Sequence, residues 1–443
     1  MYSDAGAKKM NEHATVVGAG LAGSEAAYQL LKRGFSVTLF EMKPKRFSPA
    51  HQLETFAELV CSNSLRSDRI ENAVGLLKQE LRELDSLILS CADETRVPAG
   101  GALAVDRNGF SELVTERLRS FPNLTVENGE VTQIPDSPCI IATGPLTSDA
   151  LVQSIETKLG QGLHFYDAAA PIVTKESLNF DKVFCASRYG RGEDYLNCPM
   201  NREEYFAFVR ELVKAETAPL HSFETPRVFE GCMPVEIMAK RGEMTLAYGP
   251  LKPVGLEVDG KRPFAVVQLR RDNQEDTLYN IVGFQTNLKF GEQKRVFGMI
   301  PGLEHAEFVR YGVMHRNTYL NSPGILNFDF SVKDDPMLYF AGQMTGVEGY
   351  VESAASGMTA GISLARKLRG QESLDLTRRT AIGSLGHYVS DYQGKDFQPM
   401  NVTFGIMESW PERIRSKPER YHKIAERSLA LIDHFKYVQH ISE

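Results

Sequence analysis

A glycine-rich turn close to the N-terminus constrains the fold of this chain more than any other feature. In the sequence VVGAGLAGSEAA, Gly18, Gly20 and Gly23 have the spacing G-x-G-x-x-G, between an apolar strand expected at 14–18 and a helix expected at 24–33. In such a turn the first glycine permits the tight bend and the second lets the backbone approach a pyrophosphate. The third allows close packing of helix on strand, while the helix N-terminus stabilises the anion. The pattern therefore predicts a dinucleotide site.

An acidic residue at a suitable distance strengthens this prediction. A second strand is expected at 36–41, and Glu41 ends it, 23 positions after Gly18. A carboxylate at the end of the second strand of a βαβ unit can accept a hydrogen bond from a ribose hydroxyl. The residues predicted to bind the cofactor here are Gly18, Ala19, Gly20, Leu21, Ala22, Gly23 and Glu41.

Two further segments favour FAD over NAD as the dinucleotide. CIIATGP, at 139–145, resembles the short strand and turn of two-dinucleotide-binding flavoproteins, and LYFAGQMTGVEGYVESAASGMTAGISLA, at 338–365, resembles their C-terminal flavin motif. In that motif Gly342 would end a strand, and Gly349 would bring backbone close to a ring system. A glycine-rich loop that only packs two domains together is the alternative. The chain has no second G-x-G-x-x-G, which speaks against a separate NAD(P)H domain.

The length of 443 residues suggests about two domains. The fold class we expect is α/β: a two-dinucleotide-binding-type FAD domain, Rossmann-like and discontinuous in sequence, with an inserted α/β domain. The FAD domain is predicted at 1–154 and 326–443, its second part with a basic helical C-terminus, and the inserted domain at 155–325. Further elements are expected as strands at 139–143 and 337–342 and as helices at 71–89 and 357–368.

Composition and charge limit the classes of function. Apolar residues at 42% and charged residues at 24% are typical of a globular protein, and no apolar run approaches the ~18 residues of a membrane span. The net charge of −7 argues against a uniformly basic nucleic-acid binder, although local basic clusters exist. The six cysteines include no C-x-x-C pair, which favours reduced thiols in the cytoplasm and no metal site. The oligomeric state stays open.

Six motifs give the chain a resemblance to a known family. They are VVGAGLAGSEAA, ELVCSNSLRSD, FEGCMPVE, GVMHRNTYLNSP, FAGQMTGVEGYVESAASG and KDFQPMNVTFG, and they span 16 to about 405. The chain resembles the folate- and FAD-dependent tRNA uracil-5 methyltransferases, to which ELVCSNSLR and FEGCMPVE are specific. The resemblance implies that FAD, 5,10-methylenetetrahydrofolate and NADH or NADPH serve to methylate C5 of the T-loop uridine of tRNA, giving 5-methyluridine.

The chemistry of that reaction calls for a reactive cysteine. Ground-state uracil has no electron-rich C5, and a thiolate that adds at C6 turns C5 into a nucleophile. By the resemblance, Cys232 is predicted to attack C6. Cys61 is predicted either to handle a proton or to hold a covalent intermediate near the flavin. The remaining cysteines are interpreted as small buried hydrophobic residues: Cys91, Cys139, Cys185 and Cys198.

Polar and aromatic residues in the other motifs are candidates for the folate site. His315 could stack on a pterin and Asn317 could hydrogen-bond its amide edge, with Arg316 between them, unless the triplet is a polar turn between domains. Tyr350 could stack on the isoalloxazine or the folate, or pack in the core. Glu352 is a candidate ligand of the pterin amine.

A tRNA substrate requires cations that face phosphate. The strongest basic run is RIRSKPERYHK at 413–423, with Trp410 before it, and Trp410, Arg413 and Arg415 are predicted to contact RNA. An aromatic ring among cations could stack on an unpaired base, although a solvated helix face would give the same run. Extruding the stacked T-loop uridine would cost a few kcal/mol.

Three other functions compete with this prediction. The related wobble-uridine flavoenzyme, which works with a partner GTPase, shares the glycine segments but not the cysteine-bearing motifs. A plain flavin oxidoreductase would be active without RNA or folate. A flavin-bearing RNA-binding or sensor protein without enzymatic activity would tolerate Cys232→Ala.

Overall fold

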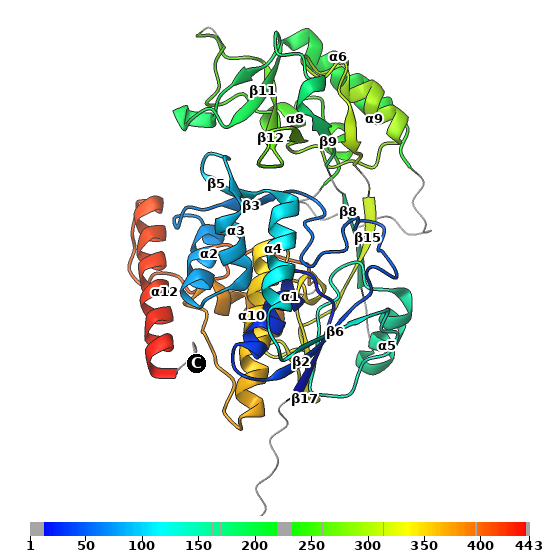
Figure 1. Cartoon of the computed structure of the whole chain (residues 1–443). Helices are drawn as coiled ribbons and strands as arrows, with labels where there is room; N and C mark the ends of the chain where they lie inside the picture. The colour runs from blue at the N-terminus through cyan, green and yellow to red at the C-terminus, as the bar shows by residue number, and fades with distance from the viewer. Residues whose placement is uncertain are drawn as a thin grey trace, which may run out of the picture.

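Six strands form the sheet that carries the glycine-rich turn (Figure 1). This computed structural model describes residues 13–160, 163–168, 170–218, 233–258, 260–312, 314–394 and 397–439; of 163–168, 314–317 and 438–439 it describes the backbone alone. The sheet has the order β16-β17-β7-β1-β2-β6, and its central neighbours are parallel. Its strands are β1 (His13–Val17), β2 (Ser36–Glu41), β6 (Leu124–Asn128), β7 (Cys139–Ile141), β16 (Ser331–Val332) and β17 (Asp335–Phe340).

Alternation of side chains along the strands gives this sheet two buried faces. Val16, Ile140 and Tyr339 pack on one side with α1 (Leu21–Leu31) and α10 (Tyr350–Leu368). Val17, Ile141 and Phe340 pack on the other side with α5 (Asp149–Leu159). Helices on both faces of a largely parallel sheet define the expected Rossmann-like α/β class. Because β17 joins β7, the sheet unites segments from both ends of the chain, as predicted.

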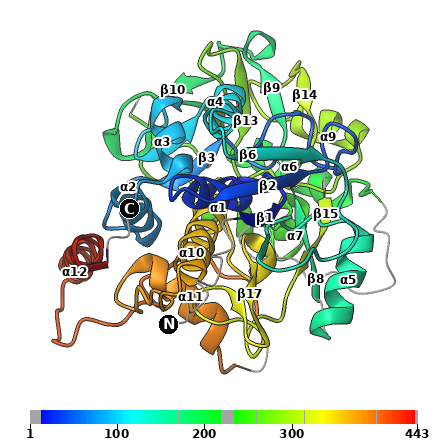
Figure 2. The ribbon, with the colours of Figure 1, turned by 60° about the horizontal axis from the view of Figure 1, so that its bottom comes forward.

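Helix α10 lies very close to helix α1 (Figure 2). A methyl group placed on Gly357 would come within 2.1 Å of the Ala22 carbonyl oxygen, and one on Gly361 within 2.8 Å of the Ala26 oxygen. These two glycines therefore let the helix backbones meet without intervening side chains. The helix predicted from 357 begins earlier, at Tyr350, because the Gly349 turn leads straight into it.

One segment that was predicted to form a single helix folds as two helices. The amphipathic segment 71–89 folds as α2 (Ala73–Glu83) and α3 (Leu87–Glu94). The break lies at Asp85, whose φ of 60° is left-handed, and Ser86 then caps α3 by accepting a hydrogen bond from the Leu89 N–H. Neither residue is a glycine or a proline, so the apolar periodicity gave no sign of this break.

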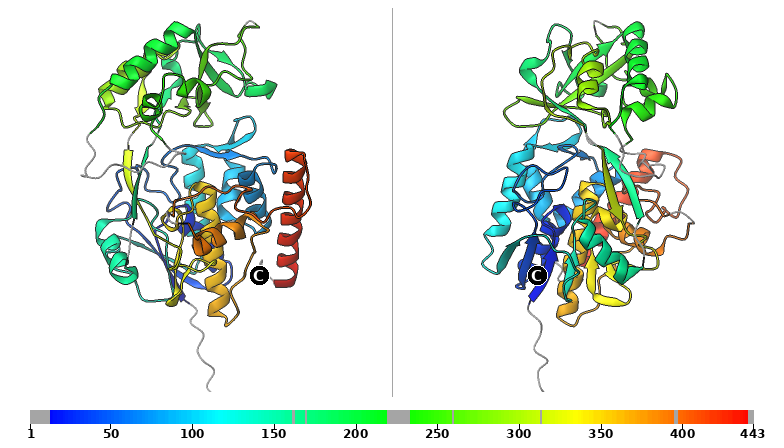
Figure 3. Two further views of the ribbon diagram at one scale, coloured as in Figure 1. Left: turned by 180° about the vertical axis from the view of Figure 1, so that it is seen from behind. Right: turned by 90° about the vertical axis from the view of Figure 1, so that its right-hand side faces the viewer.

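A second, antiparallel sheet stands above the first (Figures 1 and 3). Its order is β10-β11-β12-β13-β9-β14, and helices α6, α7, α8 and α9 pack against it. The ribbon of β8 (Leu163–Ala168) and β15 (Met314–Tyr319) runs between the two sheets. The domain boundaries at 154 and 325 stay a prediction. The elements are β9 (Ile172–Thr174), β10 (Phe184–Cys185), β11 (Tyr195–Met200), α6 (Arg202–Lys214), α7 (Val235–Lys240), α8 (Thr245–Tyr248), β12 (Ala265–Arg271), β13 (Leu278–Ile281), α9 (Phe290–Phe297) and β14 (Phe308–Arg310).

The remaining elements lie beside the first sheet. A small sheet of β3 (Ser64–Ser67), β5 (Ala102–Val105) and β4 (Arg96–Val97) leads into α4 (Arg107–Arg119). The C-terminal segment supplies α11 (Ala381–Asp391) and α12 (Lys417–Gln439), both of which contact α2 (Figures 1 and 2). No helix in the described part of the chain combines the length and apolar character needed to cross a bilayer.

A buried carboxylate ties these helices together. Glu80, on α2, accepts hydrogen bonds from the N–H groups of Ala381 (2.7 Å) and Ile382 (2.8 Å) at the start of α11 and from the Ser428 hydroxyl on α12. These bonds satisfy donors that the first turn of a helix leaves without intrahelical partners. Burial nevertheless raises the pKa of Glu80 from 4.5 to about 7.

Gly357→Ala should destabilise the protein by about 1–3 kcal/mol, because the added methyl forces α10 away from α1. Chemical denaturation and the FAD content of the purified protein would measure the effect. Gly291→Ala is the matched control, since a methyl group on Gly291, also in a helix, meets nothing within 4 Å. Equal stability of the two variants would contradict the close helix contact.

Glu80 should make the fold more stable in mild acid. Its folded-state pKa exceeds the unfolded value, so its contribution is fully present below about pH 4.5 and is lost as the pH rises through about 7. The difference in unfolding free energy between wild type and Glu80→Gln should therefore fall by up to about 3 kcal/mol over that range. Glu83→Gln, a half-exposed carboxyl lost from the same helix, is the control. A constant difference between wild type and Glu80→Gln would contradict this account.

Candidate functional site

A cleft of about 1150 Å³, including the space at its mouth, opens where the parallel strands of the first sheet end. The glycine-rich turn after β1, the end of β2 and the turn after β7 line it, together with the segment after β17. In open α/β sheets, ligands bind outside the carboxyl ends of the strands. The lining includes Gly18, Ala19, Gly20, Leu21, Ala22, Glu41, Gly342 and Tyr350, all of which the sequence predicts to bind the cofactor.

The three glycines of the turn differ in what surrounds them. Gly18 has a φ of +97°, and a methyl group on it would lie 2.7 Å from the Ala142 carbonyl oxygen. A methyl group on Gly23 would lie 1.8 Å from the Gly18 oxygen, so these two positions are filled by the fold itself. Gly20 is different, because nothing lies within 4 Å of a methyl group placed there. The open space beside Gly20 is at the N-terminus of α1, where unsatisfied N–H groups favour an anion.

Glu41 presents its carboxylate to the same cleft. It is buried, and it accepts hydrogen bonds from the backbone N–H groups of Ala19 (2.9 Å) and Lys43 (3.1 Å), one on each oxygen. Each carboxylate oxygen keeps a lone pair for a further donor. The turn, the helix end and the oriented carboxylate therefore fit the pyrophosphate and ribose of a dinucleotide such as FAD.

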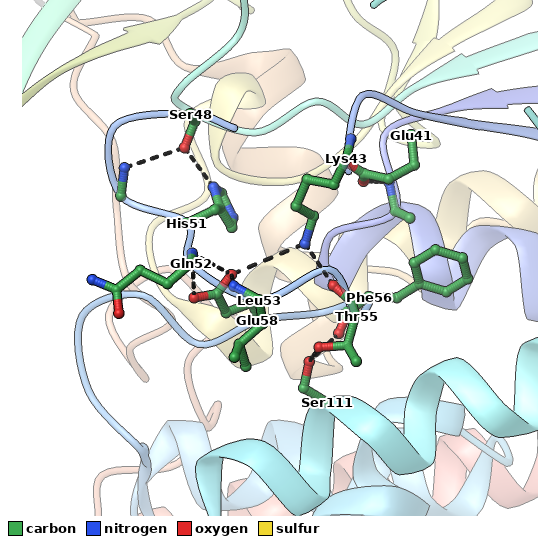
Figure 4. Close-up of polar contacts among 12 residues, drawn as sticks. Glu41, Lys43, Ser48, His51, Gln52, Leu53, Thr55, Phe56, Glu58 and Ser111 are labelled. Atoms are coloured by element: carbon green, nitrogen blue, oxygen red, sulfur yellow. Dashed lines mark hydrogen bonds and ion pairs between the residues drawn. The ribbon is translucent and has the colours of Figure 1, made fainter. Parts of the chain in front are cut away.

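A polar network holds the chain that follows β2 against the cleft (Figure 4). The Lys43 ammonium donates to the Thr55 carbonyl oxygen at 2.5 Å and lies 4.0 Å from the Glu58 carboxylate. Glu58 in turn accepts from the N–H groups of Gln52 (3.0 Å) and Leu53 (3.1 Å). Burial lowers the pKa of Lys43, which lines the cleft with Glu41. The sequence analysis missed Lys43, although its place two residues after Glu41 was a usable signal.

Tyr350 connects the cleft to Cys61. Its hydroxyl oxygen accepts hydrogen bonds from the N–H groups of Cys61 (2.8 Å) and Ser62 (3.1 Å). Burial raises the pKa of Tyr350, so its phenol stays protonated at neutral pH. Tyr350 thus lies between the dinucleotide cleft and a half-buried cysteine from the motif ELVCSNSLRSD.

An ion pair with one buried partner joins three of the sequence motifs. Arg66 pairs with Glu352, which is fully buried in the first turn of α10 and also accepts from the Val402 N–H at 2.9 Å. A methyl group on Gly349, whose φ is +115°, would lie 2.4 Å from the second oxygen of Glu352. That oxygen has no hydrogen-bond partner among the described residues, so it can accept a bond from a ligand.

Two groups of predicted residues fall wholly or partly outside the described residues. Cys232 lies in the segment 219–232, which the structure does not describe. His315, Arg316 and Asn317 belong to β15 by their backbone, but their side chains are likewise outside the description. Their roles stay predictions.

The predicted RNA-contacting residues lie near the start of α12. Arg413 and Arg415 are exposed, whereas Trp410 is half-buried and packs against the first core. The charged ends of Lys423 and Arg427 lie 5.6 and 5.8 Å from the centre of its ring. Two cations of this chain thus already contact the Trp410 ring, and its stacking on a base stays a prediction.

The other cysteines follow the sequence interpretation with one exception. Cys91, Cys139 and Cys198 are buried, and burial raises the pKa of each thiol. Cys185 was expected to be buried and is exposed instead. The reason is its place on β10, the edge strand of the second sheet.

Comparisons with known proteins agree with this arrangement. The sequence model described as "Glucose inhibited division protein A" matches residues 13–372. A methylenetetrahydrofolate–tRNA-(uracil-5-)-methyltransferase TrmFO from Acetivibrio thermocellus is 61% identical over 96% of this chain and 99% of its own length. The TrmFO of Enterococcus faecalis is 58% identical over 95% of this chain and 98% of its own. This chain belongs to the TrmFO family.

Solved structures of more distant relatives have the same fold. GidA of Aquifex aeolicus superposes with TM-scores of 0.66 and 0.67 in two crystal forms, at 15% and 16% identity. The matches cover 98% and 96% of this chain and 76% and 78% of GidA. At such identity the match establishes the fold alone, and it confirms the predicted fold class. The TrmFO relatives at 58–61% identity confirm the family named from the motifs.

Replacing single glycines of the turn should separate folding from cofactor binding. Gly20→Ala should leave the unfolding free energy of FAD-free protein unchanged but weaken FAD binding about tenfold or more, because its methyl enters the open space. Gly23→Ala should instead destabilise the FAD-free protein by about 1–3 kcal/mol, because its methyl clashes with backbone. Denaturation and FAD titration would measure both quantities. Unchanged FAD affinity in Gly20→Ala would place the pyrophosphate elsewhere.

Proposed function

We propose that this protein transfers the methylene of 5,10-methylenetetrahydrofolate to C5 of the T-loop uridine of tRNA, with electrons from NADH or NADPH, giving 5-methyluridine. The names of relatives at 58–61% identity support this reaction. The structural observation that carries the proposal is the hydrogen bond from the Cys61 N–H to the hydroxyl of Tyr350, which lines the dinucleotide cleft; Glu352 follows two residues later on α10. A cysteine, a buried carboxylate with an open oxygen and a flavin site are what such a reaction needs in one place.

FAD would bind along the cleft, with its pyrophosphate at Gly20 and its adenosine ribose at Glu41. Lys43, which lines the cleft with Glu41, would lie near that ribose. Bound and reduced, FAD supplies the electrons that turn a transferred methylene into a methyl group. Tyr350 and Gly349, at the start of α10, are the proposed contacts of the flavin ring.

The two motif cysteines would have separate tasks. Cys232 is proposed to add to C6 of the uracil, which makes C5 nucleophilic. Cys61 is proposed to act beside the flavin, either by handling a proton or by holding a covalent intermediate. The Tyr350 hydroxyl fixes the Cys61 backbone for either task.

The folate would lie between the flavin end of the cleft and β15. The oxygen of Glu352 without a hydrogen-bond partner among the described residues supports its role as acceptor for the pterin amine. His315 and Asn317 would stack on the pterin and hydrogen-bond its amide edge, with Arg316 beside them. Arg413 and Arg415 are exposed and would meet tRNA phosphates. A tRNA substrate also supports a cytoplasmic location.

The reaction can be tested with the flavin-loaded protein, NADPH, unmodified tRNA and folate labelled in its methylene carbon. The label should appear at C5 of the T-loop uridine, as mapped by mass spectrometry of nuclease digests. Cys232→Ala should abolish labelling because it removes the thiolate that activates C5, and Cys61→Ala should abolish it too. Cys185→Ala, a cysteine on an edge strand, should retain it.

Each rival function has its own outcome in this assay. NADPH oxidation without label on tRNA would favour a plain flavin oxidoreductase. Modification at the wobble uridine would favour the related flavoenzyme. Binding of tRNA without any turnover, unaffected by Cys232→Ala, would favour a flavin-bearing RNA-binding protein.

A further inference from the structure

The residues that follow Cys61 are held by an arginine of the second sheet. The Arg270 guanidinium, on β12, donates to the Ser62 hydroxyl at 2.6 Å and to the Asn63 side-chain oxygen at 3.0 Å. Asn63 is fully buried, and its amide donates to the carbonyl oxygens of Val105 and Arg271, each at 2.9 Å. Through these bonds β12 of the second sheet holds the residues after Cys61 against β5, which lies below β12 in Figure 1.

Arg270 is a buried cation whose hydrogen-bond partners are neutral. Only 7% of its surface is exposed, and its third partner is the side-chain oxygen of Asn280, at 3.5 Å. The carboxylate of Asp272, directly after β12, instead forms a two-bond pair with Arg107 at 2.9 and 3.0 Å. Burying a guanidinium without its own carboxylate is costly unless another anion lies close.

Other hydrogen-bond donors lie near the residues around Cys61. Arg107, at the start of α4, donates to the Leu59 carbonyl oxygen, and Arg310, on β14, donates to the Ala50 carbonyl oxygen at 3.0 Å. The buried amide nitrogen of Asn280 has no acceptor among the described residues. This corner of the molecule thus holds more donors and positive charges than the described residues around it neutralise.

Cys61 lies between these contacts along the chain. Arg107 donates to the Leu59 carbonyl oxygen, two residues before it, and Arg270 donates to the side chains of Ser62 and Asn63, directly after it. The carboxylates that the structure describes beside these arginines are already engaged: Asp272 pairs with Arg107, and Glu58 accepts from two backbone N–H groups and faces Lys43. The Tyr350 phenol, also adjacent, is neutral. The anion that would complete this corner is a thiolate on Cys61.

We propose that Arg270 is a positioning residue that fixes the Cys61 segment and holds Cys61 as a thiolate, with the thiol proton released to solvent. The second sheet then contributes directly to the chemistry at the flavin end of the cleft. The use of this thiolate in methylation rests on the proposed function, but its presence does not. A purely structural role for Arg270 would change stability without changing the protonation of Cys61.

Alkylation of Cys61 by iodoacetamide tests this in the flavin-loaded protein, because only the thiolate reacts. The rate at Cys61 would be followed from about pH 5 to 10 by peptide mass spectrometry, which separates it from the other cysteines. In wild type, half-maximal reactivity should fall at about pH 7 or below, under the ordinary thiol value of about 8.5. In Arg270→Gln the midpoint should rise by at least about one unit, which slows labelling at pH 5, below both midpoints, about tenfold.

Two further variants and the FAD absorbance spectrum distinguish an effect of Arg270 on Cys61 protonation from an effect on folding alone. Arg270→Lys, which keeps the charge, should restore part of the shift. Arg271→Gln is the matched control on the next position of β12, where the side chain pairs with Asp276 at 3.0 Å, and it should leave the midpoint unchanged. FAD absorbance reports whether each variant is folded and loaded. If Arg270→Gln does not fold, the midpoint of the wild-type protein alone still tests whether Cys61 is a thiolate at neutral pH.

A wild-type midpoint at about 8.5 or higher would overturn the proposal, and so would an Arg270→Gln midpoint equal to that of wild type. The tRNA-labelling assay is independent of this titration. A protein with a reactive Cys61 thiolate and no labelling of tRNA would contradict the proposed function while leaving the role of Arg270 intact.

Discussion

Helix α10 lies on helix α1 with Gly357 against the Ala22 carbonyl, and this contact between two backbones joins the first and last parts of the FAD-type domain. Because no side chain separates the helices, the first turn of α10 reaches the glycine-rich turn that begins α1. Tyr350 therefore lies at the cleft, opposite Gly20 and Glu41. The dinucleotide site is a consequence of this packing, since neither part of the chain encloses the cleft alone.

The surroundings of Cys61 depend on a second set of contacts, which are polar and partly buried. Arg66 and Glu352 join the Cys61 motif to α10, and Arg270 joins it to the second sheet. Such contacts are weak sources of stability, because desolvation offsets much of the attraction between the charges. These contacts require one arrangement of the Cys61 motif, α10 and the second sheet, because any other arrangement would leave a buried charge without a partner. This fixes the surroundings of Cys61.

The sequence predicts local elements of the fold and site well, but it does not predict contacts between residues that are far apart in the chain. The strands at 14–18, 36–41, 139–143 and 337–342 follow from short apolar runs, and the glycine spacing identifies the cofactor turn. The break at Asp85 could not be predicted, because no glycine or proline marks that left-handed residue. The pairs Arg66–Glu352 and Arg270–Ser62 join residues far apart in sequence, and only the tertiary fold brings them together. The exposure of Cys185 likewise depends on strand order.

The central claim is that one cleft brings the dinucleotide to Cys61, and a crystal structure of the FAD complex tests it most directly. The account expects the pyrophosphate beside Gly20, the ribose hydroxyls on the Glu41 carboxylate and the flavin ring beside Tyr350, next to Cys61. A dinucleotide bound outside this cleft, or a flavin ring remote from Cys61, would contradict it.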